Sequence, residues 1–294
     1  MKNFIQTKIS CIYPQINLLK AKMPFYTNLY SYTNISYWVK STPSTLLLLK
    51  EEKQLIRVYF FTNDFIELEE LITDLTHDKN LCIEILQKQP EIYFKTLKPQ
   101  ALYLRLRKTL TPLSPSSESH TNFDNINPKT LHKLLFKDFN PNFDHLPNLK
   151  MLQNRFKNRH ILSVRTQNII YSYLIFTHTG KSAYLNFIAN YGDKQSLLEI
   201  WKVFYQKLNT LEVKFLHLWC DTLNLKALNM YQKENFSIDG LKNYIYIKLS
   251  KTNGGGAYKR LRNKYLLTIL ILGSNREKTD NANRFVSNSV KQVA

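Results

Sequence analysis

Cysteine, glycine and acidic residues are all scarce in this sequence. It has 3 Cys and 7 Gly among 294 residues. The cysteines, Cys11, Cys82 and Cys220, lie far apart and form no CxxC pair, which excludes a disulfide framework and a zinc site. We expect each of them to be a small buried apolar residue. The low glycine content and the lack of sustained heptads exclude collagen-like and coiled-coil chains.

Long apolar runs are also missing. The most apolar stretch near the C-terminus runs from Tyr265 to Leu272, and these eight residues are far short of the roughly 20 that a membrane-spanning helix needs. The basic N-terminus is interrupted by polar residues and by Pro14, and no small-x-small cleavage site follows it. We therefore expect neither a signal peptide nor a membrane span, and a cytoplasmic location.

Acidic residues are few beside the basic ones, with 22 Asp and Glu against 41 Lys and Arg, a net charge of +19. Such an excess can indicate a nucleic-acid partner or an acidic membrane surface. However, residues 1–22 hold four Lys and no acid, and residues 251–294 hold nine basic and two acidic residues. More than half of the excess thus lies at the two ends. No helix pattern between them shows a one-sided Lys/Arg stripe interleaved with aromatic residues, so we expect no nucleic-acid partner.

What the sequence does have is apolar material, at 44% of residues, with 13% aromatic residues. This is enough for a packed core, and the length favours about two domains. A stretch with two Pro, many Ser and Thr and no apolar period predicts a linker between them. We predict an N-terminal extension, an N-terminal α/β domain, a linker, a second domain and a basic tail, at residues 1–22, 23–108, 109–126, 127–250 and 251–294.

Strand and helix patterns alternate in both domains. In the second domain three strands, a helix, a strand, a helix and a last strand are predicted over residues 160–249. Two helices precede them, and the first begins at Asn127-Pro128, where Asn can cap and Pro fits the first helical position. Asp239-Gly240 predicts a turn before the last strand. The N-terminal domain shows a smaller set of strands and one helix over residues 46–106. The fold class is therefore α/β with a mixed sheet.

The most informative pattern follows the last strand but one. Asn224 caps a predicted helix, and Ala227 and Tyr231 lie on one face of it. The helix ends near Asn235, a residue that tolerates a left-handed conformation, and Phe236 follows. The spacing N-x-x-A-x-x-x-Y-x-x-x-x-F resembles the last strand–helix–strand of the GNAT N-acetyltransferase superfamily. Asn235 stands where that family usually has Gly.

The resemblance extends backwards over the hairpin of residues 160–190 and the helix after it, and covers about residues 127–250. It implies a GNAT-like acyl-CoA N-acyltransferase fold. In such folds two neighbouring strands splay apart, and the pantetheine arm of acetyl-CoA or another acyl-CoA pairs with the exposed edge of one of them. That edge would be Phe187 to Asn190, where a backbone N–H would polarise the thioester carbonyl. Tyr231 would protonate the leaving thiolate as general acid.

A loop before the central helix binds the pyrophosphate in such folds through backbone N–H groups. Here Gly192, Lys194, Gln195 and Ser196 can form a reduced version of it, while Asp193 is unfavourable beside phosphate and can instead cap the helix. The resemblance implies no metal. The residues that it assigns to the cofactor are Phe187, Ile188, Ala189, Asn190, Gly192, Lys194, Gln195, Ser196, Asn224 and Ala227.

These assignments have plain structural alternatives. Tyr231 on an apolar helix face can be a core tyrosine with a satisfied hydroxyl, and Asn224 is a helix cap in either case. No general base is identified. His178 and His217 are candidates by residue type only, and His217 inside an apolar strand is more typical of a packed histidine.

The predicted function is the transfer of an acetyl or other acyl group from acyl-CoA to a primary amine of a small metabolite, amino sugar or peptide. The alternative is a GNAT-fold binding module without catalytic activity, and a third hypothesis is a basic protein that binds nucleic acid or a membrane surface. The N-terminal domain is expected to be a degenerate GNAT-like repeat or an accessory domain. The sequence specifies neither the acceptor nor the oligomeric state.

Overall fold

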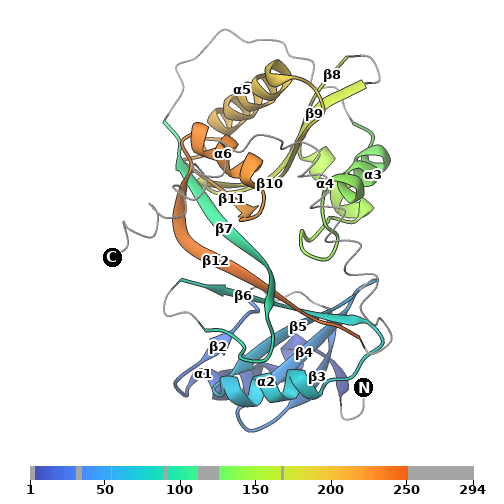
Figure 1. Cartoon of the computed structure of the whole chain (residues 1–294), viewed down its shortest axis with the longest axis vertical. Coiled ribbons are helices and arrows are strands. Elements are labelled where there is room, and N and C mark those ends of the chain that lie inside the picture. The colour runs from blue at the N-terminus through green and yellow to red at the C-terminus, as the bar shows by residue number, and fades with distance from the viewer. Residues whose placement is uncertain are drawn as a thin grey trace, which may run out of the picture. The chain divides into compact units, whose positions relative to one another are not determined.

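The computed structural model describes residues 4–30, 35–53, 55–88, 92–111, 126–166 and 169–250 (Figure 1). The predicted basic tail and residues 112–125 of the predicted linker lie outside the described residues. The described chain forms two compact units. The first unit holds the described residues up to 102 together with residues 241–250, and the second unit holds those from 103 to 240. The chain therefore changes unit twice, within β7 (Pro99–Thr109) and within β12 (Ser237–Lys248).

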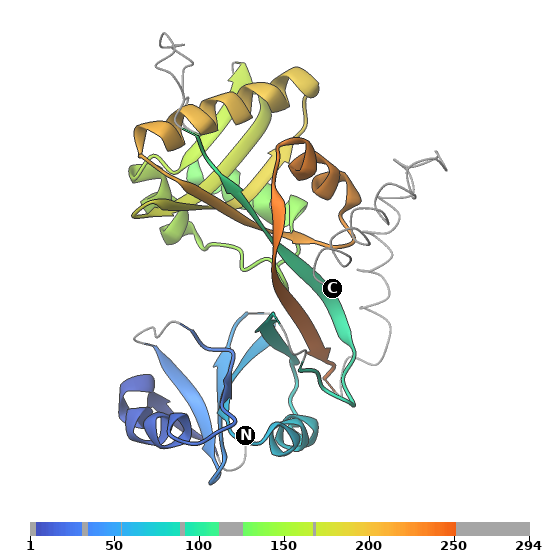
Figure 2. The same ribbon diagram turned by 90° about the vertical axis from the view of Figure 1, so that its left-hand side faces the viewer.

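The first unit is a sheet with a helix on each face (Figure 2). Its strand order is β1-β3-β4-β5-β6-β12, β2 pairs with β5, and β5 and β6 are parallel. Alternation along β4 explains the two layers, because Leu46 and Leu48 join the apolar cluster of α1. Leu47 and Leu49 join the cluster of α2 on the other face. The elements are β1 (Ile5–Lys8), the 3₁₀ helix η1 (Ile9–Ile12), α1 (Tyr13–Lys20), β2 (Tyr26–Thr27), β3 (Ser36–Ser41), β4 (Thr45–Glu51), β5 (Leu55–Thr62), α2 (Phe65–Asp74) and β6 (Asn80–Gln87).

The structure differs from the sequence prediction at residues 1–22, which were expected to be an extension. From residue 4 on they form β1, η1 and α1, and Ile16 and Leu19 are buried. The physical reason is an apolar stripe, since Ile9, Ile12, Ile16 and Leu19 recur at helical spacing and pack on the sheet. The cysteine expectation holds for Cys82 and Cys220, which are buried, but is wrong for Cys11, which is exposed in η1.

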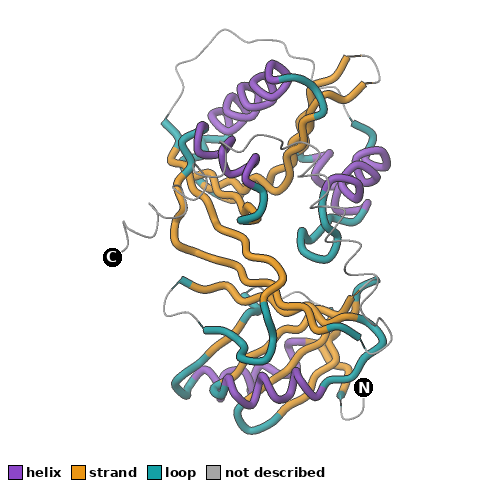
Figure 3. Tube along the Cα trace, in the orientation of Figure 1, coloured by secondary structure: helices purple, strands orange, loops and turns teal. Residues whose placement is uncertain are grey.

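The second unit is also a sheet with helices on both faces, in the strand order β12-β7-β11-β10-β9-β8 (Figure 1). The predicted order of three strands, helix, strand, helix and strand is confirmed (Figure 3). One apolar cluster unites α3 and α4 with β9 and β10, and α5 packs on the opposite face through Phe204 against Phe176. The elements are α3 (Pro128–Asp138), α4 (Leu149–Lys157), β8 (Ile161–Thr166), β9 (Ile169–Thr179), β10 (Ser182–Asn190), α5 (Lys194–Thr210), β11 (Phe215–Asp221) and α6 (Leu225–Lys233).

The turn predicted at Asp239-Gly240 is wrong, because β12 continues through both residues. Gly240 has a φ of +86°, a conformation that other residues rarely adopt, so the glycine serves a change of direction inside the strand. Two contacts with β7 hold this part of β12 extended. Arg105 Nε lies 2.6 Å from Asp239 Oδ2, and Ser237 Oγ donates to the Arg107 carbonyl at 3.3 Å.

None of the helices in the described ranges is long and apolar enough to cross a membrane.

Candidate functional site

The parallel strands β10 and β11 are hydrogen-bonded over only part of their length and diverge beyond it. They are paired from Ser182–Phe215 to Leu185–Leu218, but β10 runs on to Asn190 and β11 runs on to Asp221. On its other side β10 stays paired with β9 as far as Asn190, with a register shift between Leu185 and Phe187. This bulge, a feature that bends a strand locally, directly follows the last residue of β10 that pairs with β11. We call the opening between β10 and β11 beyond their last pair the second splay, because it lies in the second unit.

The edge of β10 in the second splay is Phe187–Asn190, the stretch that the sequence analysis assigns to a cofactor arm. Phe187 is buried against Phe139 of the α3–α4 segment, and Ala189 contacts the same cluster. No described residue forms a backbone hydrogen bond with this stretch from the side of β11. The edge therefore keeps backbone donors and acceptors for an extended ligand, and a pantetheine arm fits it.

The loop before α5 does not fit a pyrophosphate. The Asp193 carboxylate caps α5 and accepts from Ser196 N at 2.9 Å and from Ser196 Oγ at 2.8 Å. These bonds lower the pKa of Asp193, so a negative charge stands where an anion would have to bind. The amides of Tyr191 and Gly192 both donate to the Tyr171 carbonyl.

Gly192 has a packing reason rather than a phosphate-binding one. A Cβ at this position would lie 2.5 Å from Ser196 Oγ and 3.1 Å from Tyr171 Cβ. Asn190 also turns inward, since its Nδ2 donates to the carbonyls of Gly192 and Asp193. Lys194 and Gln195 remain exposed at the start of α5. The backbone N–H of Gln195 also contributes to the hydrogen bonds that lower the pKa of Asp193, so among the predicted phosphate ligands the side chains of Lys194 and Gln195 are the exposed groups at this loop.

The helix α6 is built as the motif predicts. Asn224 Oδ1 accepts from Ala227 N at 3.1 Å, and Asn235 has a φ of +60° at the end of the helix. Asn224 and Ala227 are thereby placed at one helix start, where their main contact is with each other. Their role at the cofactor arm stays a prediction.

Tyr231 lies on the inner face of α6 and is 6% exposed. Trp201 and Phe236 surround its ring, at 6.3 and 5.6 Å between centroids. Its surroundings in the described residues are apolar rings and the Cys220 thiol, and no hydrogen bond contributes to its pKa, which differs from the satisfied hydroxyl of an ordinary core tyrosine. Burial raises its pKa, and the nearby Cys220 thiol adds to the shift, so the hydroxyl stays protonated at neutral pH.

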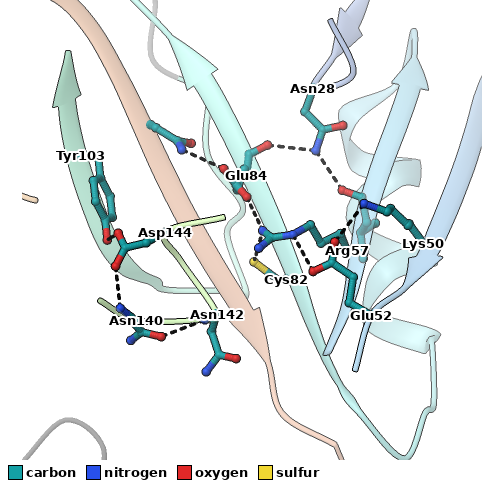
Figure 4. Close-up of polar contacts among 12 residues, drawn as sticks. Asn28, Lys50, Glu52, Arg57, Cys82, Glu84, Tyr103, Asn140, Asn142 and Asp144 are labelled. Carbon is teal, nitrogen blue, oxygen red and sulfur yellow. Dashed lines mark hydrogen bonds and ion pairs between the residues drawn. The ribbon is translucent and has the colours of Figure 1, made fainter. Parts of the chain in front are cut away.

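Two carboxyl groups near the end of β11 were not predicted from the sequence. Asp221 ends β11, opposite Tyr103 of β7. The hydroxyl of Tyr103 donates to Asp144 at 2.8 Å, and Asn140 N donates to the other oxygen of Asp144 at 2.6 Å (Figure 4). Burial raises the pKa of both carboxyl groups, and the charge of Asp221 raises that of Asp144 further. Asp221 follows a predicted strand directly, which was a usable signal, but nothing in the sequence pairs it with Asp144.

Neither histidine candidate lies beyond the last β10–β11 pair. His178 is opposite Ala183 at the hairpin end of β9, and its Nε2 lies 2.6 Å from the Gly180 carbonyl oxygen. His217 stacks on Tyr184 at 5.2 Å, within the paired part of β11. Burial lowers the pKa of His217, and the neighbouring Arg105 lowers it further. His217 is therefore a packed, neutral residue.

The first unit has the same opening, which we call the first splay. Its parallel strands β5 and β6 are paired from Leu55–Asn80 to Val58–Ile83, and then continue to Thr62 and Gln87. Here the chain itself fills the gap. The short strand β2 pairs with the far end of β5, Tyr26 with Thr62 and Thr27 with Phe61.

Asn28 follows β2 and bridges the two diverging strands (Figure 4). Its Nδ2 donates to the Val58 carbonyl of β5 and to the Glu84 carbonyl of β6, each at 2.9 Å. Its Oδ1 accepts from Phe60 N at 2.8 Å. One side-chain amide thus satisfies backbone groups of both strands at and just beyond their last pair.

Comparison with known proteins gives the fold a name. A GNAT-family acetyltransferase from Colwellia psychrerythraea superposes on 84% of this chain and 98% of its own, with a TM-score of 0.50 and 8% identity. A GCN5-related N-acetyltransferase from Sphaerobacter thermophilus covers 85% and 96%, at a TM-score of 0.49 and 12% identity. A tandem GNAT protein from the clavulanic acid biosynthesis pathway covers 84% and 98%, at 0.49 and 10%. No family model and no curated protein sequence matches the chain.

Proposed function

We propose that the second unit is an acyltransferase, which moves an acetyl or other acyl group from a pantetheine thioester such as acetyl-CoA to a primary amine. The chain has the GNAT acyl-CoA N-acyltransferase fold, with a mixed sheet and helices on both faces. The observation that carries this proposal is the second splay. It combines an open strand edge, a protonated tyrosine without a partner and carboxyl groups of raised pKa in one unit.

The residues of this chain have distinct roles in the proposed reaction. The Phe187–Asn190 edge binds the arm through its backbone and directs an N–H at the acyl oxygen, where negative charge develops. A thioester supplies an activated acyl carbon, which the amine nitrogen attacks while the C–S bond breaks. The Tyr231 hydroxyl donates its proton to the departing sulfur. The amine proton passes to a carboxylate, for which we assign Asp221.

Asp221 is suited to this role by its surroundings. A carboxylate in water is a weak base at neutral pH, and a raised pKa makes it a better proton acceptor. Asp144 carries a second carboxyl group nearby, already bonded to Tyr103 and Asn140. We infer that the acceptor enters as a small-molecule or peptide amine whose positive charge these carboxyl groups favour.

A GNAT-fold binding module without catalysis is the second candidate. The α5 loop favours it, because the Asp193 carboxylate and the internal bonds of Asn190 leave no cradle for the pyrophosphate. Under the acyltransferase proposal, affinity comes mainly from the arm and CoA binds weakly.

Calorimetric titration separates the two candidates. We expect acetyl-CoA and pantetheine, which lacks the nucleotide, to bind with similar affinity at sub-millimolar to millimolar concentration. A screen of primary amines with the bound donor should then release free thiol. If neither compound binds at millimolar concentration, the acyltransferase proposal fails.

A further inference from the structure

We propose that Asn28 and the strand before it are a permanent internal substitute for a cofactor arm in the first unit. The chain then has one acyl-donor site, in the second unit, and the first unit is not a second acyltransferase. The assignment of the remaining donor site rests on the proposed function, whereas the substitution in the first unit rests on its own contacts.

The chemistry of Asn28 matches what an arm would offer. A pantetheine arm presents amide N–H and C=O groups, and its edge partner in a splay is the strand backbone. The Asn28 side chain is itself an amide, and it accepts from Phe60 N and donates to the Val58 carbonyl on β5. Its second N–H reaches the Glu84 carbonyl on β6, so it joins both strands. Every donor and acceptor of this amide has a partner.

The residues beside Asn28 extend the substitution along the splay. Thr27 Oγ1 donates to the Phe60 carbonyl at 2.7 Å and accepts from Leu29 N at 3.1 Å. Leu29 is 7% exposed and belongs to the apolar cluster of α1. Tyr30 donates its hydroxyl to the Leu86 carbonyl of β6 at 3.3 Å. The segment 26–30 is therefore anchored at both strands and in the core, and is not a loosely attached loop.

The first splay also lacks the groups that acyl transfer needs. Residues 88 and 92–98, the described part between β6 and β7, form no helix, so no described helix there corresponds to α6 and its Tyr231. Arg57 is bonded to Glu84 at 2.6 Å and to Glu52 at 3.1 Å (Figure 4). Burial raises the pKa of the Cys82 thiol to about 12, which keeps it from acting as a nucleophile.

The start of α2 is closed in the same way as the start of α5. The Asp64 carboxylate accepts from Ile66 N at 2.9 Å and from Glu67 N at 3.1 Å. No anion site is therefore left at this helix. The described residues of the first unit therefore provide the sheet of the fold without an open edge at this splay, a counterpart of Tyr231 after β6 or an anion site at α2.

Hydrogen–deuterium exchange of the full chain tests the proposal without any substitution. Exchange is followed with and without 5 mM pantetheine, roughly the level at which weak ligands saturate. We expect amides 58–62 and 84–86 to be slow in the free protein and unchanged by pantetheine, since Asn28 already occupies the splay. Protection of amides 58–62 by pantetheine would overturn the proposal. Failure of pantetheine to protect 187–190 would instead count against the proposed function and leave this one standing.

Asn28→Ala tests the cause, and Asn63→Ala is its matched control. Asn63 also donates its side-chain amide to three backbone carbonyls of the first unit, those of Leu19, Lys22 and Pro24. We expect Asn28→Ala to speed exchange at the Phe60 amide about tenfold or more, the loss of one buried hydrogen bond. Asn63→Ala should leave that amide unchanged and speed exchange near residues 19–24.

A milder variant keeps the test decisive if Asn28→Ala unfolds. Asn28→Asp retains the acceptor for Phe60 N and removes both donated bonds, so β6 should lose protection at residues 84–86 while Phe60 keeps most of its own. Equal exchange in wild type, Asn28→Asp and Asn63→Ala across both segments would show that Asn28 does not hold the splay, and would overturn the proposal.

Discussion

Each unit contains a parallel strand pair that diverges beyond its last hydrogen bond, but the opening is filled by the chain in one unit and left free by the described residues in the other. In the first unit β5 and β6 part after Val58–Ile83, and in the second β10 and β11 part after Leu185–Leu218. Asn28 fills the first opening with its side-chain amide, and the described chain leaves the second edge free. A parting of strands exposes backbone groups that must find a partner. The comparison teaches that a side chain of the same protein can satisfy these backbone groups. The opening then has no free strand edge for a ligand.

The largest expected effect comes from Asp221, the carboxyl group of the second unit to which we assign the amine proton. Asp221→Asn should lower kcat about 100- to 10,000-fold, because the amide cannot accept the amine proton. In the wild type the rate should fall as pH falls through the raised pKa of Asp221, since protonation removes the base. A pH–rate profile of both proteins checks this.

Leu223 provides the control for that experiment, because its amide donates to Asp221 Oδ1 while its side chain is exposed. Leu223→Ala should keep the wild-type pH profile. An Asp221→Asn enzyme that retains the acid limb of the wild type would remove Asp221 from the mechanism.

Tyr231 has no counterpart among the described residues between β6 and β7, and its effect comes next in size. Tyr231→Phe should lower kcat about 100-fold through loss of the proton donor. The free energy of unfolding should change by less than about 1 kcal/mol, because no hydrogen bond to the hydroxyl is lost. Steady-state rates and urea unfolding measure the two quantities.

Tyr205→Phe is a matched comparison, since its hydroxyl contacts Glu234 at 2.9 Å and Lys108 at 2.8 Å. It should cost more stability than Tyr231→Phe and less activity. The reverse ranking would identify Tyr231 as a structural residue.

The smallest effect concerns the start of α5, which is capped by Asp193 as the start of α2 in the first unit is capped by Asp64. Asp193→Asn keeps a capping oxygen and removes the charge, so we expect acetyl-CoA to bind about three- to tenfold more tightly. Pantetheine, which has no phosphate, should bind as before. Calorimetry measures both affinities, and an equal gain for the two ligands would show that the charge of Asp193 does not act on the nucleotide.

Asp64→Asn in the first unit should leave both affinities unchanged, because its helix start serves no donor site. This variant also removes one carboxylate from a capped helix, and so controls for the general effect of net charge.

Local sequence patterns predicted most of the helices and strands of the second unit. The helix at Asn224 begins with a side-chain cap and ends at a left-handed Asn235, as the sequence predicts, because both features depend on a few neighbouring residues. The Asp193 cap was foreseen as the alternative to phosphate binding for the same reason.

Features that depend on distant partners were not predictable. Asn28 lies in a stretch without clear periodicity, and its partners are 30 to 56 positions away. The pairing of Tyr103 with Asp144 spans 41 positions, and Asp221 comes beside Tyr103 only through the register of β7 and β11. The prediction of a turn at Asp239-Gly240 was wrong because β12 continues through both residues, where Asp239 pairs with Arg105, more than a hundred positions earlier.

A crystal structure with a hydrolysis-resistant acetyl-CoA analogue tests the contrast between the two splays most directly. We expect one arm per chain, bound along Phe187–Asn190 with its sulfur near the Tyr231 hydroxyl, and Asn28 still bonded to Val58, Phe60 and Glu84. An arm bound between β5 and β6 with Asn28 displaced would contradict this contrast.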